Sequence, residues 1–572
     1  MLDIRELSIT ETKPAIAILV KGKLSISQIQ HDLVLPLQAK NITNDLYVSS
    51  LYAKGKKPLV AEVKSHCQQM LPALSQLGVT ILLVTDSTYF GVMTGIKAKP
   101  AEYEGFAFPC VIQGYEHMTC ILGVHPYVCL INPDRYTDQD YALETIKRCL
   151  TGKYKHPGSD VIHYEAYPES VADIAKWLDH LLEYPELTCD IETLGLKHIY
   201  AGLGTISFAW SKHEGIAFSV SMNRSYEEAV EILKLLNQFF TKYQGKLTYH
   251  NAGYDVKQLI YMLFMKTPWD YEGLLYGLEV MTRNIDDTKI ISYLATNSAA
   301  GNRLGLKQQA KEFLGKYSEK DIEDITKIPL PQLLQYNLKD CLGTWYTKEK
   351  NYPIMVADQQ ESVYFDVFKP AIKQIIQMEL TGLPVNPHRV MEVDDELTTY
   401  QNSQLEAIQQ HPVVLRFMEE SEIPALVVAK NAEYKKKVID SSYFADRVFN
   451  PNSNAQLSRL LFEFIGFEVT SYTPAKQPST DRDALTELYA KALELGEQSI
   501  ADLVKAIMEF AKVNKVVTAF IPAFRDAFLF PDNIARVFGS FNLGGTVSGR
   551  LSSSNPNLNV HTISMLHGAS YQ

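Results

Sequence analysis

The chain has 572 residues, more than one hydrophobic core usually organises, and its 46% hydrophobic and 21% charged residues exclude wholesale disorder. Its net charge of −11 argues against binding nucleic acid through one overall positive field, although a local basic strip could still hold phosphates. No apolar run approaches the ~20 residues that span a bilayer, and the acidic start does not fit a signal peptide, so we expect a cytoplasmic protein without a membrane partner.

The first 160 residues have the pattern of an α/β domain. Two apolar runs, GVTILLVTD (78–86) and TCILGVHP (119–126), end in turn residues, as buried strands do. The polar Gly/Pro stretch at 151–160 predicts a linker, which gives a first domain of residues 1–160. The seven cysteines of the chain form no CxxC pair, so we expect reduced, mostly buried thiols rather than zinc ligands or disulfides.

A second α/β domain is expected at residues 161–352. Apolar residues at helical spacing (170–184) precede two strand candidates, LTCDIETLGL (187–196) and LGTISFAW (203–210), and the alternation of strands and helices continues to about residue 350. This alternation predicts a mixed sheet. Beyond it, long helical patterns at 362–383, 480–496 and 499–521 predict a mostly helical third domain, 353–572, whose Gly/Ser/Asn-rich tail favours strands and loops.

Three pairs of polar residues in the second domain are candidates for a functional site. Asp190 and Glu192 are two apart in a strand candidate, so both side chains leave one face of the sheet; an exposed acidic edge is the alternative. Asn251 and Asp255 are four apart at a predicted helix start, where helix capping would also explain them.

The third pair, Tyr336 and Asp340, shares one face of a strongly predicted helix with Leu333, Leu334 and Leu338 on its apolar side. A packed tyrosine beside a solvated acid is the alternative here. Taken together, four carboxylates from a strand and two helices can hold two divalent cations about 3.5 to 4 Å apart, the arrangement used for in-line attack on phosphodiesters. Hard oxygen ligands favour Mg²⁺ or Mn²⁺.

The motifs D-I-E (190–192), H-N-A-G-Y-D (250–255) and Y-N-L-K-D (336–340) resemble, in order and spacing, the proofreading exonucleases of the DEDD superfamily, tyrosine subtype. The resemblance implies a ribonuclease H-like fold and 3′→5′ exonuclease activity. It also implies metal ligands at Asp190, Glu192, Asp255 and Asp340, with Tyr336 orienting the attacking water and Asn251 in support. The resemblance extends to the segment between the last two motifs, which has the D-T pair at Asp287 and Thr288 and the L-K pair at Leu306 and Lys307. Residues 301–303 depart from the family pattern, because a histidine is commoner there.

Downstream segments resemble family A DNA polymerases. The segments are MELTGLPVN (378–386), FNPNSNAQLSRLLFEFIGFEV (449–469), STDRDALTEL (479–488) and FNLGGTVSGRLSSSNPNLNV (541–560). The last matches the motif T-x-T-G-R-L-S-S-x-x-P-N-L-Q-N, with serine at 548 and Asn-Val at 559–560 as departures. The resemblance is closest to phage-type enzymes. It implies DNA contacts by Thr546, Arg550, Ser552 and Asn557, and it favours phosphate contacts for Lys505, Lys512 and Lys515 over a merely solvated helix face.

The palm and fingers motifs of that family have no counterpart in the sequence. We therefore expect a split or truncated polymerase whose partner, besides a single-stranded 3′ end and primer-template DNA, is a second polypeptide with palm and fingers. The first domain, with HPYVCLINP after its second strand, resembles a degenerate uracil-DNA glycosylase. No catalytic acid for that chemistry is evident, and His125 is interpreted as a buried turn residue.

Two other functions stay open. The chain could be a stand-alone DEDD-type nuclease that acts on RNA or DNA, or a non-catalytic DNA-binding subunit of a polymerase assembly whose acids are structural.

Overall fold

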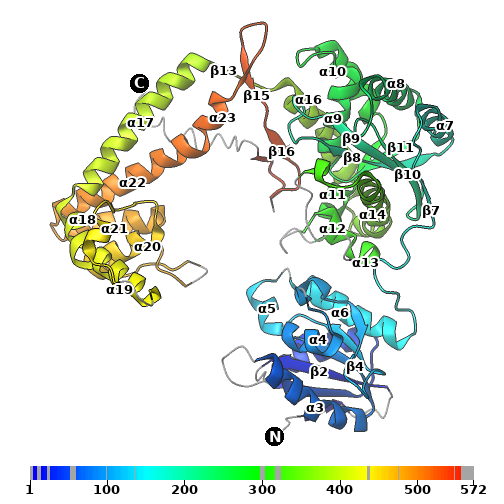
Figure 1. Ribbon diagram of the computed structural model, residues 1–572, viewed down its shortest axis with the longest axis horizontal. Coiled ribbons are helices and arrows are strands. Elements are labelled where there is room, and N and C mark those ends of the chain that lie inside the picture. The colour runs from blue at the N-terminus through cyan, green and yellow to red at the C-terminus, as the bar shows by residue number, and fades with distance from the viewer. Residues whose placement is uncertain are drawn as a thin grey trace. The chain divides into compact units, whose positions relative to one another are not determined.

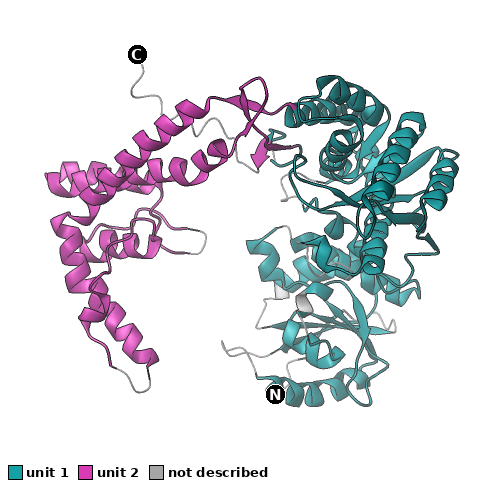
Figure 2. Ribbon diagram, turned by 45° about the horizontal axis from the view of Figure 1, so that its top comes forward, with its two compact units in different colours: residues 1–380, 543–551 teal, residues 381–542, 552–572 magenta. Residues whose placement is uncertain are grey.

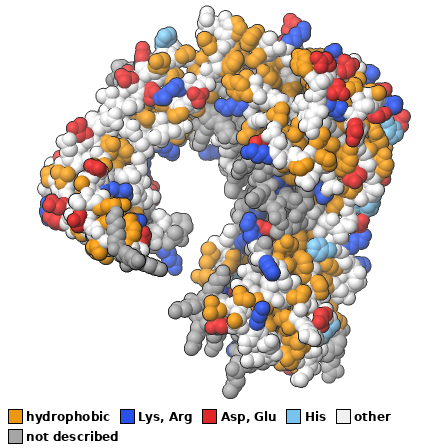
Figure 3. Space-filling model, in the orientation of Figure 1, with side chains coloured by type: hydrophobic (Ala, Val, Ile, Leu, Met, Phe, Trp, Pro, Cys, Tyr) orange, Lys and Arg blue, Asp and Glu red, His pale blue; other side chains and the backbone are white. Residues whose placement is uncertain are grey.

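The computed structural model describes residues 4–8, 14–21, 26–51, 59–97, 99–133, 135–296, 303–315, 324–434, 438–473, 476–546 and 548–554. The chain forms two compact units (Figures 1 and 2). Unit 1 comprises residues 1–380 and 543–551, and unit 2 comprises residues 381–542 and 552–572. On the part of unit 1 visible in Figure 3, acidic and basic side chains are interspersed among scattered hydrophobic ones.

The N-terminal part of unit 1 is a sheet covered by helices on both faces. Its six strands lie in the order β1-β3-β2-β4-β6-β5, with β3, β2, β4 and β6 parallel and both edge strands antiparallel. Alternation along β2 sends Ala17 and Leu19 toward a core with α3 and α4, and Ile16 and Ile18 toward one with η1, α2 and α6. The elements are β1 Ile4–Ser8, β2 Ala15–Lys21, α1 Ile26–Ile29, η1 Gln30–Val34, α2 Leu35–Ala39, β3 Leu46–Leu51, α3 Val60–Gln76, β4 Val79–Val84, α4 Ser87–Thr94, η2 Pro100–Tyr103, β5 Ala107–Pro109, β6 Thr119–Leu122, α5 Pro126–Ile131 and α6 Arg135–Leu150.

The second part of unit 1 is built on a mixed sheet in the order β12-β11-β8-β9-β10-β7. The long central strand β8 is parallel to β11 and antiparallel to β9. One face packs on α7 to α10, and the other packs on the long helix α14. The elements are β7 Tyr164–Ala166, α7 Val171–Leu181, β8 Glu186–Thr193, β9 Leu203–Ala209, β10 Glu214–Ser219, α8 Tyr226–Lys242, β11 Lys246–Tyr249, α9 Ala252–Phe264, α10 Tyr271–Thr282, β12 Ile285–Asp287, α11 Thr288–Ala295, α12 Leu306–Gln309, α13 Lys311–Leu314, η4 Ile325–Lys327 and α14 Leu330–Ala357.

Residues 361–380, predicted to begin the polymerase part, pack with this sheet. They form α15 (Glu361–Val363), the π-helical turn η5 (Tyr364–Phe368) and α16 (Lys369–Thr381). Ile372, Ile376 and Leu380 of α16 join the core under β8. The Lys257 ammonium on α9 lies 2.6 Å from the Glu379 carboxylate, and both side chains are buried. The division into three domains stays a prediction, but compact packing continues past residue 352.

Unit 2 is mostly helical. The long helices α17 and α22 pack together, and α21 packs against α22 around Phe417, Leu460 and Ile507. Short strands form a three-stranded sheet, β13-β15-β14, and the β16-β17 pair. The elements are β13 Leu383–Val385, α17 Pro387–Gln409, α18 Pro412–Phe417, η6 Met418–Glu422, α19 Ile423–Glu433, η7 Ser441–Phe444, α20 Asn454–Ser458, η8 Arg459–Phe464, α21 Arg482–Glu494, α22 Gln498–Ala519, α23 Ile521–Arg525, β14 Phe528–Leu529, β15 Ala535–Val537, β16 Ser540–Asn542 and β17 Ser552–Ser554.

The predicted α/β multidomain fold is confirmed, including the strands at 78–86, 119–126, 187–196 and 203–210 and the helices from 362 onward. All seven cysteines are free, and only Cys149 is not fully buried. None of the helices in the described ranges combines the length and the apolar character that crossing a membrane requires.

Candidate active site

Three carboxylates meet at the end of the central strand. Asp190 and Glu192 on β8 and Asp340 on α14 each offer one oxygen atom, and these three atoms lie within 4.8 Å of one another. The alternation predicted for β8 is observed: Leu187, Cys189 and Ile191 are buried on the opposite face of the sheet, in the core with α7 to α10. The acids therefore lie on the α14 side of the sheet.

Hydrogen bonds between side chains of the sheet and backbone carbonyls of the helix fix the register of α14 on β8 and β9. The Thr188 hydroxyl donates to the Cys341 carbonyl (3.0 Å), and the Ser207 hydroxyl donates to the Asn337 carbonyl (2.9 Å). A carbonyl oxygen has two lone pairs, so it can accept these bonds in addition to the helical one. The rotation of α14, and with it the direction of Asp340, is thereby set.

Asn337, one turn before Asp340, orients Asp190 directly. Its side-chain oxygen accepts a hydrogen bond from the Thr205 hydroxyl (3.1 Å), and its amide nitrogen donates to Asp190 Oδ2 (2.6 Å). The side chain is completely buried. The sequence analysis gave Asn337 no role, although the residue lies within the Y-N-L-K-D motif, because neither the motif nor a polar position among leucines identifies its partners.

Asp255 belongs to the same electrostatic cluster, although it is outside the set of three oxygens within 4.8 Å. It is buried in the first turn of α9, and the backbone N–H of Ile191 donates to its carboxylate. Strand β11 pairs with β8 only along residues 186–188, so Ile191 lies beyond the end of that ladder. The structure thus brings the acids of β8 and α14 together, with the buried Asp255 of α9 close enough to interact with them electrostatically.

The acids raise one another's pKa. Burial is the largest cause at Asp190, followed by the charges of Asp340, Asp255 and Glu192. Burial and then the charge of Asp340 raise the pKa of Glu192 to about 8, and burial also raises that of Asp255. Buried like charges of this kind favour a bound cation, which would replace the protons that otherwise neutralise them. The oxygen-only donor set fits Mg²⁺ or Mn²⁺.

Asp287 and Asn251 hold the start of α9. The Asp287 carboxylate accepts hydrogen bonds from the backbone N–H groups of Asn251 (3.0 Å), Ala252 (2.9 Å) and Lys289 (2.8 Å). Asn251 precedes the helix with a φ of 71°, a left-handed conformation that asparagine tolerates well. Its side chain makes no capping bond and instead accepts from Lys289 Nζ (3.1 Å), so the alternative of a side-chain cap is not found for Asn251.

Tyr336 lies on α14 one turn before Asp340 and is half-buried. The Lys307 ammonium lies 5.1 Å from the centre of its ring. Lys307 also lowers the pKa of Glu192, against the larger effect of burial. This lysine is thus a cation near both the tyrosine and the acids, a position that the sequence motif alone did not indicate.

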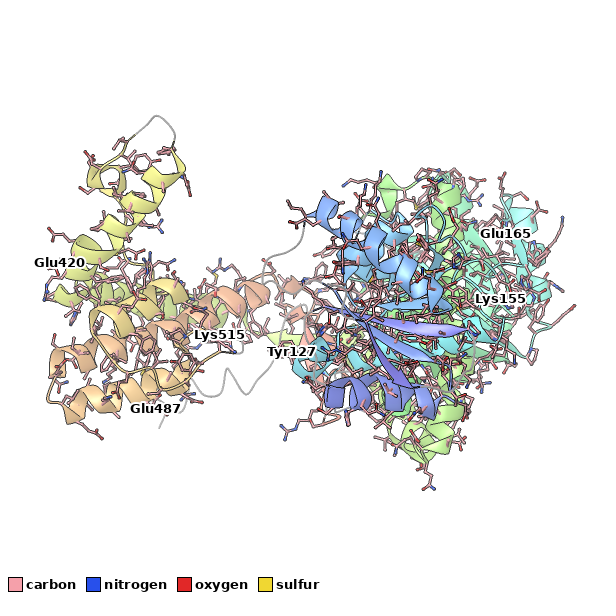
Figure 4. All side chains as sticks on the ribbon, turned by 90° about the horizontal axis from the view of Figure 1, so that it is seen from below. Tyr127, Lys155, Glu165, Glu420, Glu487 and Lys515 are labelled. Atoms are coloured by element: carbon pink, nitrogen blue, oxygen red, sulfur yellow. The ribbon has the colours of Figure 1, made fainter. Side chains whose placement is uncertain are left out.

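The lysines predicted to contact DNA are on α22 in unit 2. Lys505, Lys512 and Lys515 are exposed, opposite the buried stripe of the helix, as the periodicity predicts. Lys512 and Lys515 line a cavity of about 450 Å³ together with Asp481 and Arg482 at the start of α21. Figure 4 labels Lys515 on this helix.

The segment that resembles the family A motif forms a turn. The Thr546 hydroxyl donates to the Arg550 carbonyl (2.8 Å), and Tyr293 of α11 donates to the Thr546 carbonyl (3.1 Å). The Arg550 side chain is exposed, and Ser552 begins β17. Asn557, with Pro556 and Leu558 to Val560, lies outside the described residues.

His125 caps the short helix α5. Its Nδ1 accepts from the Tyr127 backbone N–H (3.1 Å), and its Nε2 lies 2.9 Å from the Lys21 carbonyl. It is a turn residue, as predicted, but it is half-buried rather than buried, because the helix that it caps lies at the surface, with Tyr127, Val128 and Leu130 exposed.

Two family models match the chain. Residues 187–352, which contain the acid cluster, match a model of the RNase H superfamily, and residues 375–568 match DNA polymerase family A. The carboxylate cluster on this mixed sheet thus lies in the part of the chain that matches the RNase H superfamily.

Relatives in phages point to the same family. The DNA polymerase of Bacillus phage SP01 is 26% identical over 57% of this chain and 35% of its own length, and that of Escherichia phage T5 is 22% identical over 82% and 50%. The solved POL domain of Pol1 from M. smegmatis, in a complex with DNA primer-template and dNTP, is 17% identical with a TM-score of 0.42, over 69% of this chain and 55% of that one. The chain spans about a third to a half of the length of the two phage relatives. The chain is thus similar to family A DNA polymerases.

Proposed function

We propose that the chain is a two-metal 3′→5′ DNA exonuclease that proofreads as part of a family A replicative polymerase. The observation that carries the proposal is the meeting of Asp190, Glu192 and Asp340 oxygens within 4.8 Å, with buried Asp255 nearby. Mg²⁺ or Mn²⁺ bound there would supply an activated water and would stabilise the leaving 3′ oxygen.

The protein's own groups have separate tasks in this proposal. The four carboxylates would hold the cations, and Asn337 would keep Asp190 turned toward them through its 2.6 Å hydrogen bond. Asp287 would hold the start of α9, which brings Asp255 to the cluster. The Tyr336 phenol would orient the attacking water, a role in which a hydroxyl both donates and accepts.

The exonuclease proposal is tested with 3′-labelled DNA. We expect the wild-type chain to release mononucleotides from the 3′ end in Mg²⁺ or Mn²⁺ and to stop when EDTA is added. Asp190→Ala should lower the rate at least ~100-fold, because ligand removal disrupts the whole site. Glu227→Ala, a change of an exposed acid on α8, is the matched control and should keep the wild-type rate. Equal rates for wild type and Asp190→Ala would refute the proposal.

DNA is the substrate that we favour over RNA, because residues 375–568 match DNA polymerase family A. Matched DNA and RNA oligonucleotides test this choice: faster trimming of RNA would favour a stand-alone nuclease instead. Loss of primer-template binding on changing Lys512 and Lys515 would support the DNA contacts proposed for unit 2. The partner polypeptide with palm and fingers, and action in a bacterial host cytoplasm, stay predictions that copurification from infected cells would test.

A further inference from the structure

A basic cavity lies in unit 1 away from the carboxylate cluster. It has a volume of about 580 Å³, within the range of ordinary ligand sites. Its lining comes from the end of α6, the segment 151–160, the turn between β9 and β10, α13 and α14. Five cationic side chains, Lys147, Arg148, Lys153, Lys155 and Lys212, line it together with three acids, Glu144, Asp160 and Glu312. The excess of cations contrasts with the chain's net charge of −11.

Two of these cations have close acidic partners: Lys155 lies 2.7 Å from Asp160, and Lys212 lies 2.7 Å from Glu349. The other two acids of the cavity do not neutralise the remaining cations. Glu144 is shared with Lys40, and Glu312 is shared with Lys350, and neither of these lysines lines the cavity. Arg148 lies as far as 3.7 Å from Glu312. In the described part of the chain, Lys147 and Lys153 form no ion pair. The cavity therefore holds uncompensated positive charge.

A plainer explanation is that these cations compensate the partial negative charge at the C-terminal end of α6. It accounts for Lys147 and Arg148, which lie in the last turn of that helix. Ion pairs with Asp160 and Glu349 account for Lys155 and Lys212. Neither explanation accounts for Lys153, which lies beyond the end of α6. Two lysines that line one hollow without an acidic partner favour an anionic ligand.

One wall of the cavity is aromatic. The rings of Phe313 and Tyr346 are stacked, with centroids 5.0 Å apart and planes at 11°, and both rings line the cavity. His213 meets Phe313 edge to face, with centroids 5.5 Å apart. Flat rings beside lysines are the pairing that binds bases and phosphates of nucleotides.

Close backbone contacts hold the wall in place. The Gly158 N–H donates to the Phe313 carbonyl (2.9 Å), and the His163 N–H donates to the His213 carbonyl (2.9 Å). A Cβ on Gly158, whose φ is +84°, would lie 2.8 Å from the Leu314 carbonyl oxygen, so only glycine fits there. The hydrogen bonds at Gly158 and His163 thus hold the end of the predicted linker against the aromatic wall, and the shape of the cavity is set by the fold.

We propose that this cavity binds a phosphorylated nucleoside, with its phosphate held by Lys147 and Lys153 and its base against Tyr346 and Phe313. The ligand is a free nucleotide or one unit of a single strand, since both present the same chemistry. The site is separate from the carboxylate cluster, so it does not depend on the exonuclease proposal.

Equilibrium binding of dTMP and of a (dT)12 strand to the full chain tests the site. EDTA is present, so that divalent cations at the carboxylates cannot hold phosphate. Lys147→Ala/Lys153→Ala should weaken binding of at least one probe about tenfold, because two charge-assisted contacts are lost. Lys64→Ala/Lys266→Ala, a matched loss of two exposed lysines elsewhere in unit 1, should leave both affinities unchanged. Unfolding temperatures equal to wild type would show that both double variants fold.

The two arms distinguish the sources of the ligand. A loss confined to dTMP identifies a free nucleotide, and a loss confined to (dT)12 identifies a strand that crosses the cavity. No binding of either probe, or equal affinities for wild type and Lys147→Ala/Lys153→Ala, would overturn the proposal. Tyr346→Leu and competition by inorganic phosphate test whether the base is bound. If Tyr346→Leu leaves the affinity for dTMP unchanged and inorganic phosphate competes as strongly as unlabelled dTMP, the site does not bind a nucleoside.

Discussion

Replacing Glu192 by glutamine should stabilise the metal-free protein in alkaline solution. Two unit charges 4.8 Å apart repel each other by about 3 kcal/mol at an effective dielectric constant of about 20. Glu192 lies within that distance of two other acids, and burial adds to the cost of its charge. The folded protein therefore keeps this carboxyl protonated more readily than the unfolded chain does.

The pH dependence follows from the shift. The pKa of Glu192 is raised from 4.5 to about 8, so between these values the folded protein binds more protons than the unfolded one. Stability must then fall as pH rises through this window, by up to about 1.4 kcal/mol per pH unit from Glu192 alone. Below the window, the protonated carboxyl and the glutamine amide are both neutral, and the difference should vanish.

Thermal unfolding in EDTA at about pH 4, below the window, and at about pH 9 measures this effect. Glu192→Gln should unfold at a higher temperature than wild type at the upper pH only. In Mg²⁺, wild type should instead unfold at the higher temperature. A cation that binds only the folded protein stabilises it, and wild type, which has all of its carboxylates, should bind the cation more tightly. Glu227→Gln, which changes an exposed acid, is the control. Equal pH profiles for wild type and Glu192→Gln would refute the electrostatic reasoning.

Three other changes test neighbouring contacts. Asn337→Ala should lower the kcat of the proposed exonuclease about tenfold, because Asp190 loses the donor of its 2.6 Å hydrogen bond. KM should stay unchanged, because Asn337 does not take part in strand binding. A change in KM alone would contradict this role of Asn337. Lys257→Met should lower stability by about 3 to 5 kcal/mol because the buried Glu379 carboxylate loses its ion pair with the ammonium, and Lys257→Met/Glu379→Leu should recover most of the loss; hydrogen exchange of α9 measures both, and no recovery would count against the pair. Tyr336→Phe should slow cleavage at least about tenfold while Mg²⁺-dependent stabilisation stays as in wild type; an unchanged rate would remove the tyrosine from the mechanism.

For the two acids of the strand, local geometry was enough to predict their place in the cluster. A spacing of two in a strand puts Asp190 and Glu192 on one face, whatever the rest of the fold does. The buried Leu187, Cys189 and Ile191 then fix which face is left for the acids. Resemblance to known motifs supplied the partners on the two helices, which strand periodicity could not.

Asn337 and Lys307 were out of reach of the same reasoning. The role of Asn337 depends on the Thr205 hydroxyl and on Asp190, which are contributed by two different strands. Lys307 comes near Glu192 and Tyr336 only because α12 and α14 pack together. Neither contact has a period or a composition that a sequence pattern could reveal, because both arise from tertiary packing.

The start of the polymerase-like region had a clear sequence motif, but in the structure this start packs with unit 1. The segment 378–386 was predicted to enter the polymerase part, and yet its Glu379 forms a buried ion pair with Lys257, two residues after Asp255 on α9. A buried pair of this kind is costly unless both partners are present. The beginning of the family A match therefore also holds the helix that carries one of the acids.

The position of the cluster follows from where strand pairing stops. Strand β11 accompanies β8 only to Thr188, whereas β8 continues to Thr193 alongside β9. Past that point, an amide on this side of β8 has no strand to pair with, and an unpaired buried N–H is costly. The Asp255 carboxylate accepts the Ile191 N–H and so removes this cost. The same hydrogen bond that completes the sheet thus brings the acid of α9 to the acids of β8.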